Sequence, residues 1–162
     1  PLNDKRRNSF FMLVNILGGP GMNSRLNWAL REKHGYVYSI GSSYYPFSDT
    51  GLFMISFGTE PTQMGKSLQL IGEELRKLKE IPLGVKQMNA AREQLYGQLA
   101  MTEENNGTFM MMMARSMLDR GKVLAIEDTY AMIRETTSHA LMELANDIFD
   151  EPQFSILRME PN

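Results

Sequence analysis

The sequence contains no cysteine and only two histidines, His34 and His139. Without cysteine the chain can form no disulfide, no thiol nucleophile and no cysteine-ligated zinc site. The two histidines lie far apart in the sequence, and neither belongs to a His-Glu-x-x-His or His-x-x-Glu-His pattern. No Gly-x-Ser-x-Gly elbow, phosphate loop or calcium loop is present. The residues alone therefore indicate neither a catalytic centre nor a metal site in this chain.

The chain also lacks a strong charge and a long apolar run. A net charge of -2 gives no general attraction to nucleic acid or to an anionic membrane. No apolar stretch approaches the length of a membrane span, and no signal peptide is visible, so the compartment stays open. With 43% hydrophobic and 22% charged residues, the 162 residues are typical of a single globular domain over 1–162. Because the chain begins at Pro1 rather than Met, we expect a piece of a longer protein.

Hydrophobic spacing predicts an α+β fold, in which an antiparallel or mixed sheet is covered by helices. Residues 52–58 are apolar on both sides, which favours a central strand covered by helices on at least one side. Turn residues between the two predicted strands indicate a hairpin. The expected strands are 36–45, 52–58 and a short one at 154–157, and the expected helices are 8–17, 25–33, 63–79, 85–104, 108–118, 126–135 and 138–149.

A glycine and a run of methionines are unusual features inside the predicted helices. Gly97 costs about 1 kcal/mol against alanine in a helix, so we expect a close neighbour there. Residues 110–113 are four successive methionines, which point in every direction around a helix. Flexible core packing is the favoured interpretation, and a copper site made of thioethers is the alternative.

Residues 30–39, Leu-Arg-Glu-Lys-His-Gly-Tyr-Val-Tyr-Ser, lead from a helix end directly into a strand. Gly35 supplies the left-handed residue that ends the helix, and Tyr36, Tyr38 and Ile40 should share one face of the strand. Arg31 and Tyr38 can then project toward a common point, where a guanidinium and a phenol suit a peptide carbonyl or an oxyanion. An exposed arginine at a helix end and a tyrosine in a sheet is the simpler alternative, which the residues alone favour.

The order of segments resembles a known family. Residues 15–26, Asn-Ile-Leu-Gly-Gly-Pro-Gly-Met-Asn-Ser-Arg-Leu, followed by residues 30–39, look like the second domain of the insulinase/pitrilysin family of zinc peptidases. This family includes insulin-degrading enzyme and the mitochondrial processing peptidase. Weaker similarity continues through residues 48–53 and 91–97, so the resemblance covers nearly the whole chain.

The resemblance implies a role in peptide hydrolysis that depends on a partner. In this family two related domains face each other across a chamber, and one carries His-x-x-Glu-His, a later Glu and the zinc. The other has lost the metal ligands and contributes an Arg and a Tyr, which match Arg31 and Tyr38 here. Arg31 would hold a substrate carbonyl and Tyr38 would steady the oxyanion, while the zinc would sit on a partner domain in the same polypeptide or in a separate subunit.

The glycine-rich turn has two interpretations under this resemblance. Gly18, Gly19 and Gly21 either form a loop near the substrate path or simply make a tight helix–helix connection. A phosphate loop is excluded, because no Gly-Lys-Ser/Thr follows.

The family also contains non-proteolytic structural subunits of a respiratory complex, which gives a second hypothesis. The presence of both Arg31 and Tyr38 favours the peptidase role, since a scaffold has no need of the pair. The chain departs from the family in lacking the strands that precede the first helix. We therefore expect a sheet truncated at its N-terminal strands, with an exposed edge that pairs with another chain or lowers stability.

Overall fold

The computed structural model describes residues 1–123 and 125–160. It confirms the α+β prediction and nearly all of the predicted elements. The strands are β1 (Val37–Pro46) and β2 (Gly51–Thr59). The helices are α1 (Arg7–Gly18), α2 (Met64–Glu80), α3 (Val85–Glu104), α4 (Asn106–Arg120), α5 (Ile126–Glu135) and α6 (Ser138–Ile148), with a π-helical segment η1 (Asn27–Glu32) and short 3-10 turns η2 (Pro61–Gln63) and η3 (Glu151–Gln153).

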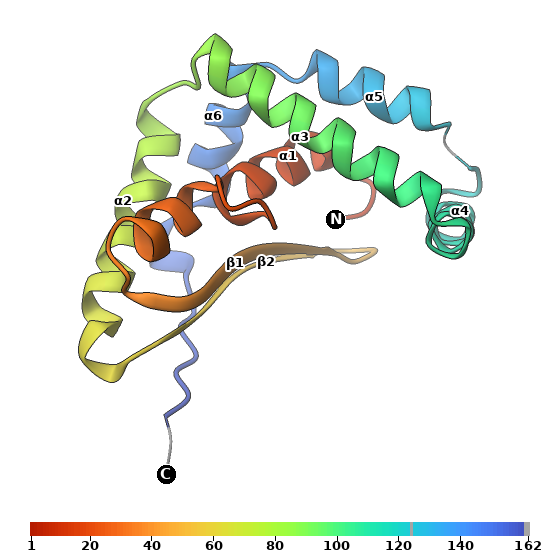
Figure 1. The fold of residues 1–162 in the computed structure, drawn as a ribbon. Helices are drawn as coiled ribbons and strands as arrows, with labels where there is room; N and C mark the ends of the chain where they lie inside the picture. Colours follow the sequence, from red (N-terminus) through yellow and green to blue (C-terminus); the bar gives the residue numbers. More distant parts are fainter. Residues whose placement is uncertain (124, 161–162) are drawn as a thin grey trace.

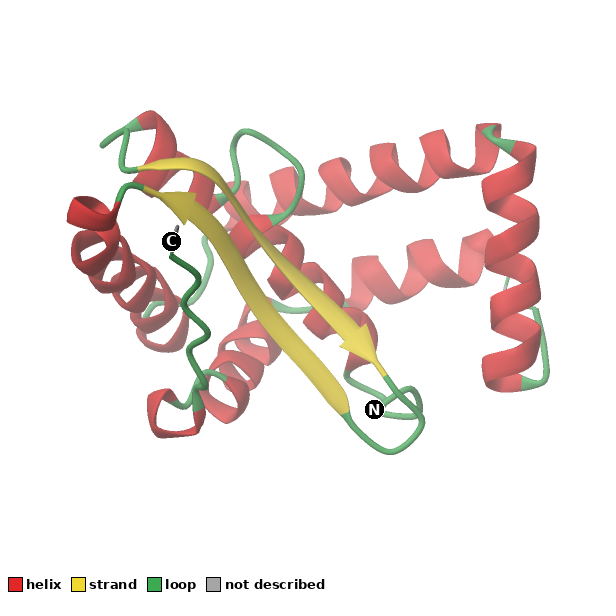
Figure 2. Ribbon diagram, turned by 90° about the horizontal axis from the view of Figure 1, so that it is seen from below, coloured by secondary structure: helices red, strands yellow, loops and turns green. Residues whose placement is uncertain are grey.

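The two strands form an antiparallel hairpin that lies against the helices on one side. Helix α1 runs along β1, and Figures 1 and 2 show the hairpin beneath the helical layer with its other face open. From Ser39 onward, successive residues of the paired strands alternate between the two faces. Ile40 pairs with Phe57 and Tyr44 with Phe53, and these four side chains pack against the core. Leu52 and its neighbours on the outer face remain exposed.

The prediction of a central second strand is wrong for this chain. Among the described residues the sheet consists of β1 and β2 alone, so both strands are edge strands. The apolar character of β2 on both sides leaves Leu52 and Met54 exposed on the outer face. The two-stranded sheet leaves backbone donors and acceptors unpaired at both edges among the described residues.

Aromatic contacts and buried aliphatic residues join the hairpin to the helices. The Phe10 ring of α1 meets the Tyr44 ring edge-on at 4.9 Å, and Phe53 meets Phe149, next to the end of α6, at 5.1 Å. Such pairs add about 0.5–1.5 kcal/mol beyond their area burial. The largest fully buried apolar side chains lie in α1, α3, α6 and the η1 region or directly beside them: Met12, Leu13, Leu17, Leu26, Leu30, Leu95, Leu141 and Phe149.

Two further expectations are corrected by the structure. Residues 154–160 form neither helix nor strand, because no other described strand lies alongside to pair with them. An ideal Cβ built on Gly97 meets no atom within 4 Å, so close packing does not explain that glycine.

None of the described helices has the length and apolar character needed to cross a membrane.

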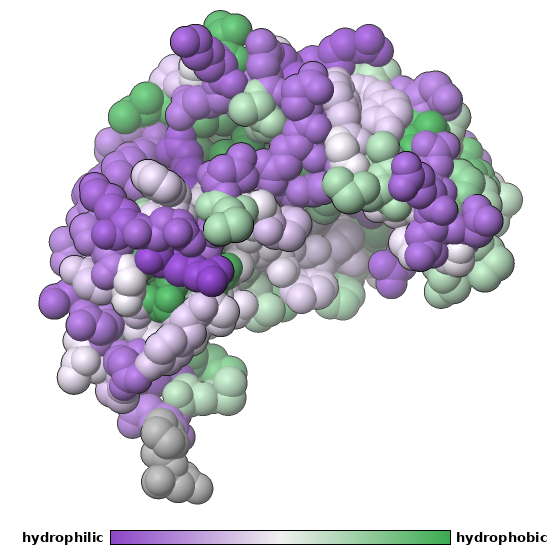
Figure 3. Space-filling view, in the orientation of Figure 1, coloured by the Kyte–Doolittle hydropathy of each residue, from purple (hydrophilic) through white to green (hydrophobic). Residues whose placement is uncertain are grey.

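The methionine run is also not core packing. Helix α4 contains no buried residue among those described, and Met110 and Met111 are 59% and 64% exposed. Helix α4 crosses the far ends of α3 and α5 (Figure 2), so its neighbours cover only one side of it. Four successive residues point in four directions around a helix, so the four methionines cannot all be covered. Figure 3 accordingly shows apolar residues gathered at the α4 end of the molecule.

Candidate functional site

The segment that carries Arg31 is a helix end with a buried inner side. Arg25 and Leu26 begin the helix, which continues as the π-helical segment η1. Leu30 is 0% exposed, and Lys33 donates its backbone N–H to the Trp28 carbonyl at 2.9 Å, five residues back. π-Helical turns are rare and concentrate at functional sites. The sequence spacing predicted the helix but not its wider turn.

Gly35 ends this helix as predicted. Its φ of 63° lies in the left-handed region that favours glycine. The Gly35 N–H donates to the Arg31 carbonyl at 3.0 Å, and the Tyr36 N–H donates to the Leu30 carbonyl at 2.8 Å. These two bonds satisfy carbonyls at the helix end and set the direction in which β1 leaves. The distance between Arg31 and the strand is therefore determined by a capped, hydrogen-bonded turn.

Arg31 itself points away from the core. Its side chain is 51% exposed, and its only ion pair among the described residues is with the adjacent Glu32, at 4.0 Å. A pair of this length at the surface contributes about 0–1 kcal/mol. The guanidinium is consequently available to bind a ligand, while the backbone beneath it is held by Leu30.

Tyr38 sits on a β-bulge that the sequence did not reveal. Val37 pairs with Thr59 and Ser39 with Gly58, so Tyr38 is an extra residue in β1. The bulge shifts the alternation, because Val37 and Ile40 both pack on the core although they lie three residues apart, whereas Tyr38 is 66% exposed. The prediction that Tyr36, Tyr38 and Ile40 share a face is therefore wrong. Bulges commonly redirect a side chain beside a functional site.

The structure places Arg31 and Tyr38 on neighbouring elements, because η1 packs against β1. They do not hydrogen-bond to each other in the described part of the chain. Instead, the Tyr38 hydroxyl donates a hydrogen bond to the carboxylate of Glu60, which follows β2. Sequence analysis missed Glu60, since nothing in its spacing from Tyr38 indicates the contact before the hairpin register is known.

An ion pair ties this region to α2. Arg25 approaches Glu74 at 3.7 Å, and both side chains are largely buried. Burial lowers the pKa of Arg25, and the Glu74 carboxylate opposes that shift. Trp28, the single tryptophan, is 61% exposed and lies in the same π-helical segment, three residues before Arg31. Tryptophan is enriched among the residues that dominate binding interfaces, so an exposed tryptophan is a signal that sequence analysis passed over.

The glycine-rich turn is held tightly against β1 and α3. A Cβ on Gly18 would lie 2.7 Å from the Ser42 nitrogen, and one on Gly21 would lie 2.6 Å from Gln94 Nε2. The Ser42 hydroxyl also donates to the Val14 carbonyl at 2.8 Å. These contacts give a packing reason for the glycines and support the tight-connection interpretation. A role of Gly18, Gly19 and Gly21 beside the substrate path stays a prediction.

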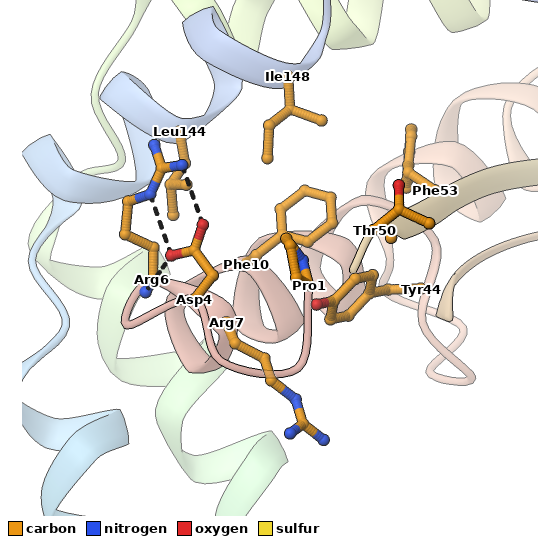
Figure 4. Close-up of a pocket in the computed structure, with 11 residues that line it drawn as sticks. Pro1, Asp4, Arg6, Arg7, Phe10, Tyr44, Thr50, Phe53, Leu144 and Ile148 are labelled. Atoms are coloured by element: carbon orange, nitrogen blue, oxygen red, sulfur yellow. Dashed lines mark hydrogen bonds and ion pairs between the residues drawn. The ribbon is translucent and has the colours of Figure 1, made fainter. Parts of the chain in front are cut away.

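A separate open pocket of about 310 Å³ lies between α1, the hairpin and α6. Figure 4 shows the Asp4–Arg6 ion pair on one side of it and the Tyr44 and Phe53 side chains on the other. Asp4 and Arg6 are paired with each other, and neither Arg31 nor Tyr38 lines the pocket. We therefore do not place the candidate site there.

The described residues do not fit a zinc site. No three of their His, Asp or Glu side chains gather as metal ligands would. His34 stacks on Tyr36 at a centroid distance of 5.1 Å, and His139 faces Glu143 at 3.3 Å.

Comparison with known proteins identifies relatives over almost the full chain. An uncharacterized zinc protease of Streptomyces coelicolor is 32% identical over 155 residues, which is 95% of this chain and 34% of the relative. The chain thus spans about a third of the length of this curated relative.

Solved structures show the same fold. A protease from Helicobacter pylori superposes with a TM-score of 0.82 at 18% identity, covering 94% of this chain and 37% of that one. The peptidase M16 inactive domain from Pseudomonas fluorescens superposes with a TM-score of 0.78 at 23% identity, covering 90% of this chain and 34% of that one. The family model described as the peptidase M16 inactive domain matches residues 1–95. Because that match spans more than half of the 162 residues, the chain belongs to the M16 (insulinase/pitrilysin) family of zinc proteases, as its inactive domain.

Proposed function

We propose that the chain is the substrate-binding domain of a zinc metallopeptidase and completes the active site of a zinc-bearing partner domain. The observation that carries this proposal is the exposed pair Arg31 and Tyr38, held on a rigid, capped turn and a β-bulge. A scaffold needs no such exposed guanidinium and phenol above a buried platform. The whole chain, residues 1–162, forms one such domain in this proposal.

The side chains present suggest separate roles for the zinc-bearing domain and for this chain. Zinc, when bound by the partner domain, supplies the nucleophilic water and polarises the scissile carbonyl. Arg31 has five N–H donors and no acceptor, so it binds a substrate carbonyl oxygen. Tyr38 contributes a second polar contact to the peptide. In this proposal Gly18, Gly19 and Gly21 also border the substrate path.

The isolated chain provides the first test. We expect it to bind no stoichiometric zinc in metal analysis and to leave unfolded peptides intact, because its donor groups do not gather. Restored peptide cleavage on addition of the zinc-bearing domain supports the proposal. Chelator-sensitive proteolysis by the purified chain alone contradicts it.

We also propose that the exposed sheet edge pairs with a second copy when the partner domain is absent. The outer residues Leu52 and Met54 are exposed beside an unpaired edge, which is a template for strand addition. Sedimentation velocity should detect a concentration-dependent dimer that Met54→Lys weakens. A chain that stays monomeric at all concentrations rules out this association.

A further inference from the structure

A second pocket, of about 320 Å³, lies between the start of α1, the end of α4 and helix α5. Its lining includes the cations Lys5, Arg7 and Arg120, and we call it the basic pocket. Asp4 is the carboxylate among its lining residues, and Arg6 holds that carboxylate in an ion pair at 3.1 Å. The positive charges of the basic pocket are therefore not neutralised by its own carboxylate.

Arg7 is half-buried, and its own surroundings give it little to bind. Its Nη1 donates to the Leu2 carbonyl at 3.5 Å, which is longer than an ordinary hydrogen bond. Figure 4 shows the Arg7 side chain pointing away from the Asp4–Arg6 pair. Arg7 also lies in the first turn of α1, which contains no acidic residue, although cations are favoured at the opposite end of a helix. Most of its hydrogen-bonding capacity is thus free for a negatively charged ligand.

Two arginines of α4 add positive charge beside Arg7. Burial lowers the pKa of Arg7, and the charges of Arg120 and Arg115 lower it further. Asp119 opposes this shift, but in the described part of the chain it makes no ion pair within 4 Å, and the same holds for Lys5 and the three arginines. Like charges that gather without a counter-ion repel one another and destabilise the compact state. A bound anion would remove that repulsion.

We propose that the basic pocket binds a phosphate group through Lys5, Arg7 and Arg120. Each guanidinium is a planar fork of N–H donors that matches two phosphate oxygens at once, and the lysine adds a third cation. A phosphate monoester carries a charge of about −1.5 to −2 near neutral pH, so it offsets three cations better than a single carboxylate does. The site is separate from the proposed peptidase role, because neither Arg31 nor Tyr38 lines the pocket.

Binding of inorganic phosphate to the chain tests the inference. Isothermal titration calorimetry gives the dissociation constant, and thermal unfolding gives the stabilisation. At a phosphate concentration ten times the dissociation constant, we expect Tm to rise by about 3–6 °C. Sodium chloride at the same ionic strength should raise Tm much less, because chloride screens charge without accepting paired hydrogen bonds. Equal shifts in the two salts would overturn the inference.

Variants of the pocket are needed as well, because phosphate stabilises folded proteins in general. Arg7→Ala and Arg120→Ala should each raise the dissociation constant for phosphate about tenfold or more, the effect of losing charge-assisted hydrogen bonds. Arg120 is exposed, so its variant tests the pocket even if Arg7→Ala fails to fold. Arg76→Ala removes an exposed arginine from α2 and should keep wild-type binding. Unchanged phosphate affinity in Arg120→Ala would overturn the inference.

The Tm of Arg120→Ala in the two salts separates ligand binding from a structural role. In chloride this variant should unfold at the wild-type temperature or slightly above it, because the repulsion on Arg7 is reduced. In phosphate it should unfold below wild type. An equal loss of Tm in both salts would show a structural role and overturn the inference. Glycerol phosphate then identifies the source: tighter binding than that of inorganic phosphate assigns the pocket to the phosphate group of a larger molecule, and weaker binding assigns it to the free ion.

Discussion

Replacing Arg31 by alanine in the complete peptidase is expected to lower kcat/KM about 100-fold or more, the usual cost of one preorganised donor at a reacting carbonyl. The fold should be unaffected. Arg31 is exposed, and its ion pair with Glu32 at 4.0 Å contributes little to stability. Kinetics with a fluorogenic peptide, alongside thermal unfolding of the same preparation, measure both effects.

Two further variants make this result specific. Lys33→Ala removes a neighbouring exposed cation from the same turn and should leave turnover nearly unchanged. Arg31→Lys keeps the charge but loses the planar fork of donors, so it should recover only part of the activity. Unchanged turnover in Arg31→Ala would instead favour the structural-subunit hypothesis, in which the pair has no contact with substrate.

Replacing Leu30 by alanine has the largest expected effect on stability. Leu30 is 0% exposed and lies directly beneath the helix end that carries Arg31. Truncation of a fully buried leucine costs about 2–5 kcal/mol, through lost burial and the cavity left behind. Typical domains have only about 5–15 kcal/mol of total stability, so the loss takes a large share. Urea unfolding of the chain, followed by circular dichroism, measures it.

The neighbouring position supplies the control for this experiment. Arg31→Ala should change the urea midpoint very little, although it lies one residue away, because its side chain faces solvent. A loss below about 1 kcal/mol for Leu30→Ala would contradict the account, since it would mean that the helix end is not packed as a rigid platform.

Sequence reasoning was most successful where local chemistry decides the structure. Gly35 could be assigned to a left-handed turn because few other residues adopt that conformation, and the structure confirms it. The hairpin and the inward residues Leu26 and Leu30 followed from hydrophobic spacing. The family resemblance then singled out Arg31 and Tyr38, which composition and spacing could not do.

The errors come from features that depend on tertiary pairing. The bulge at Tyr38 is a property of register between two strands, and alternation read from one strand cannot reveal it. Glu60 lies 22 residues from Tyr38 and meets it only once that register is set. The expected strand at 154–157 and the buried methionine run failed for a related reason. Both needed a packing partner that the described residues do not provide.

The central claim is that this domain completes an active site whose zinc lies on another domain. The most direct test mixes the zinc-bearing domain from the same reading frame, or from a neighbouring gene, with this chain and follows peptide cleavage. The account predicts little cleavage by either alone, chelator-sensitive cleavage by the mixture, and its loss when the added chain carries Arg31→Ala but still binds its partner. Full cleavage by the zinc-bearing domain without this chain, or by a mixture containing the Arg31→Ala chain, would contradict it.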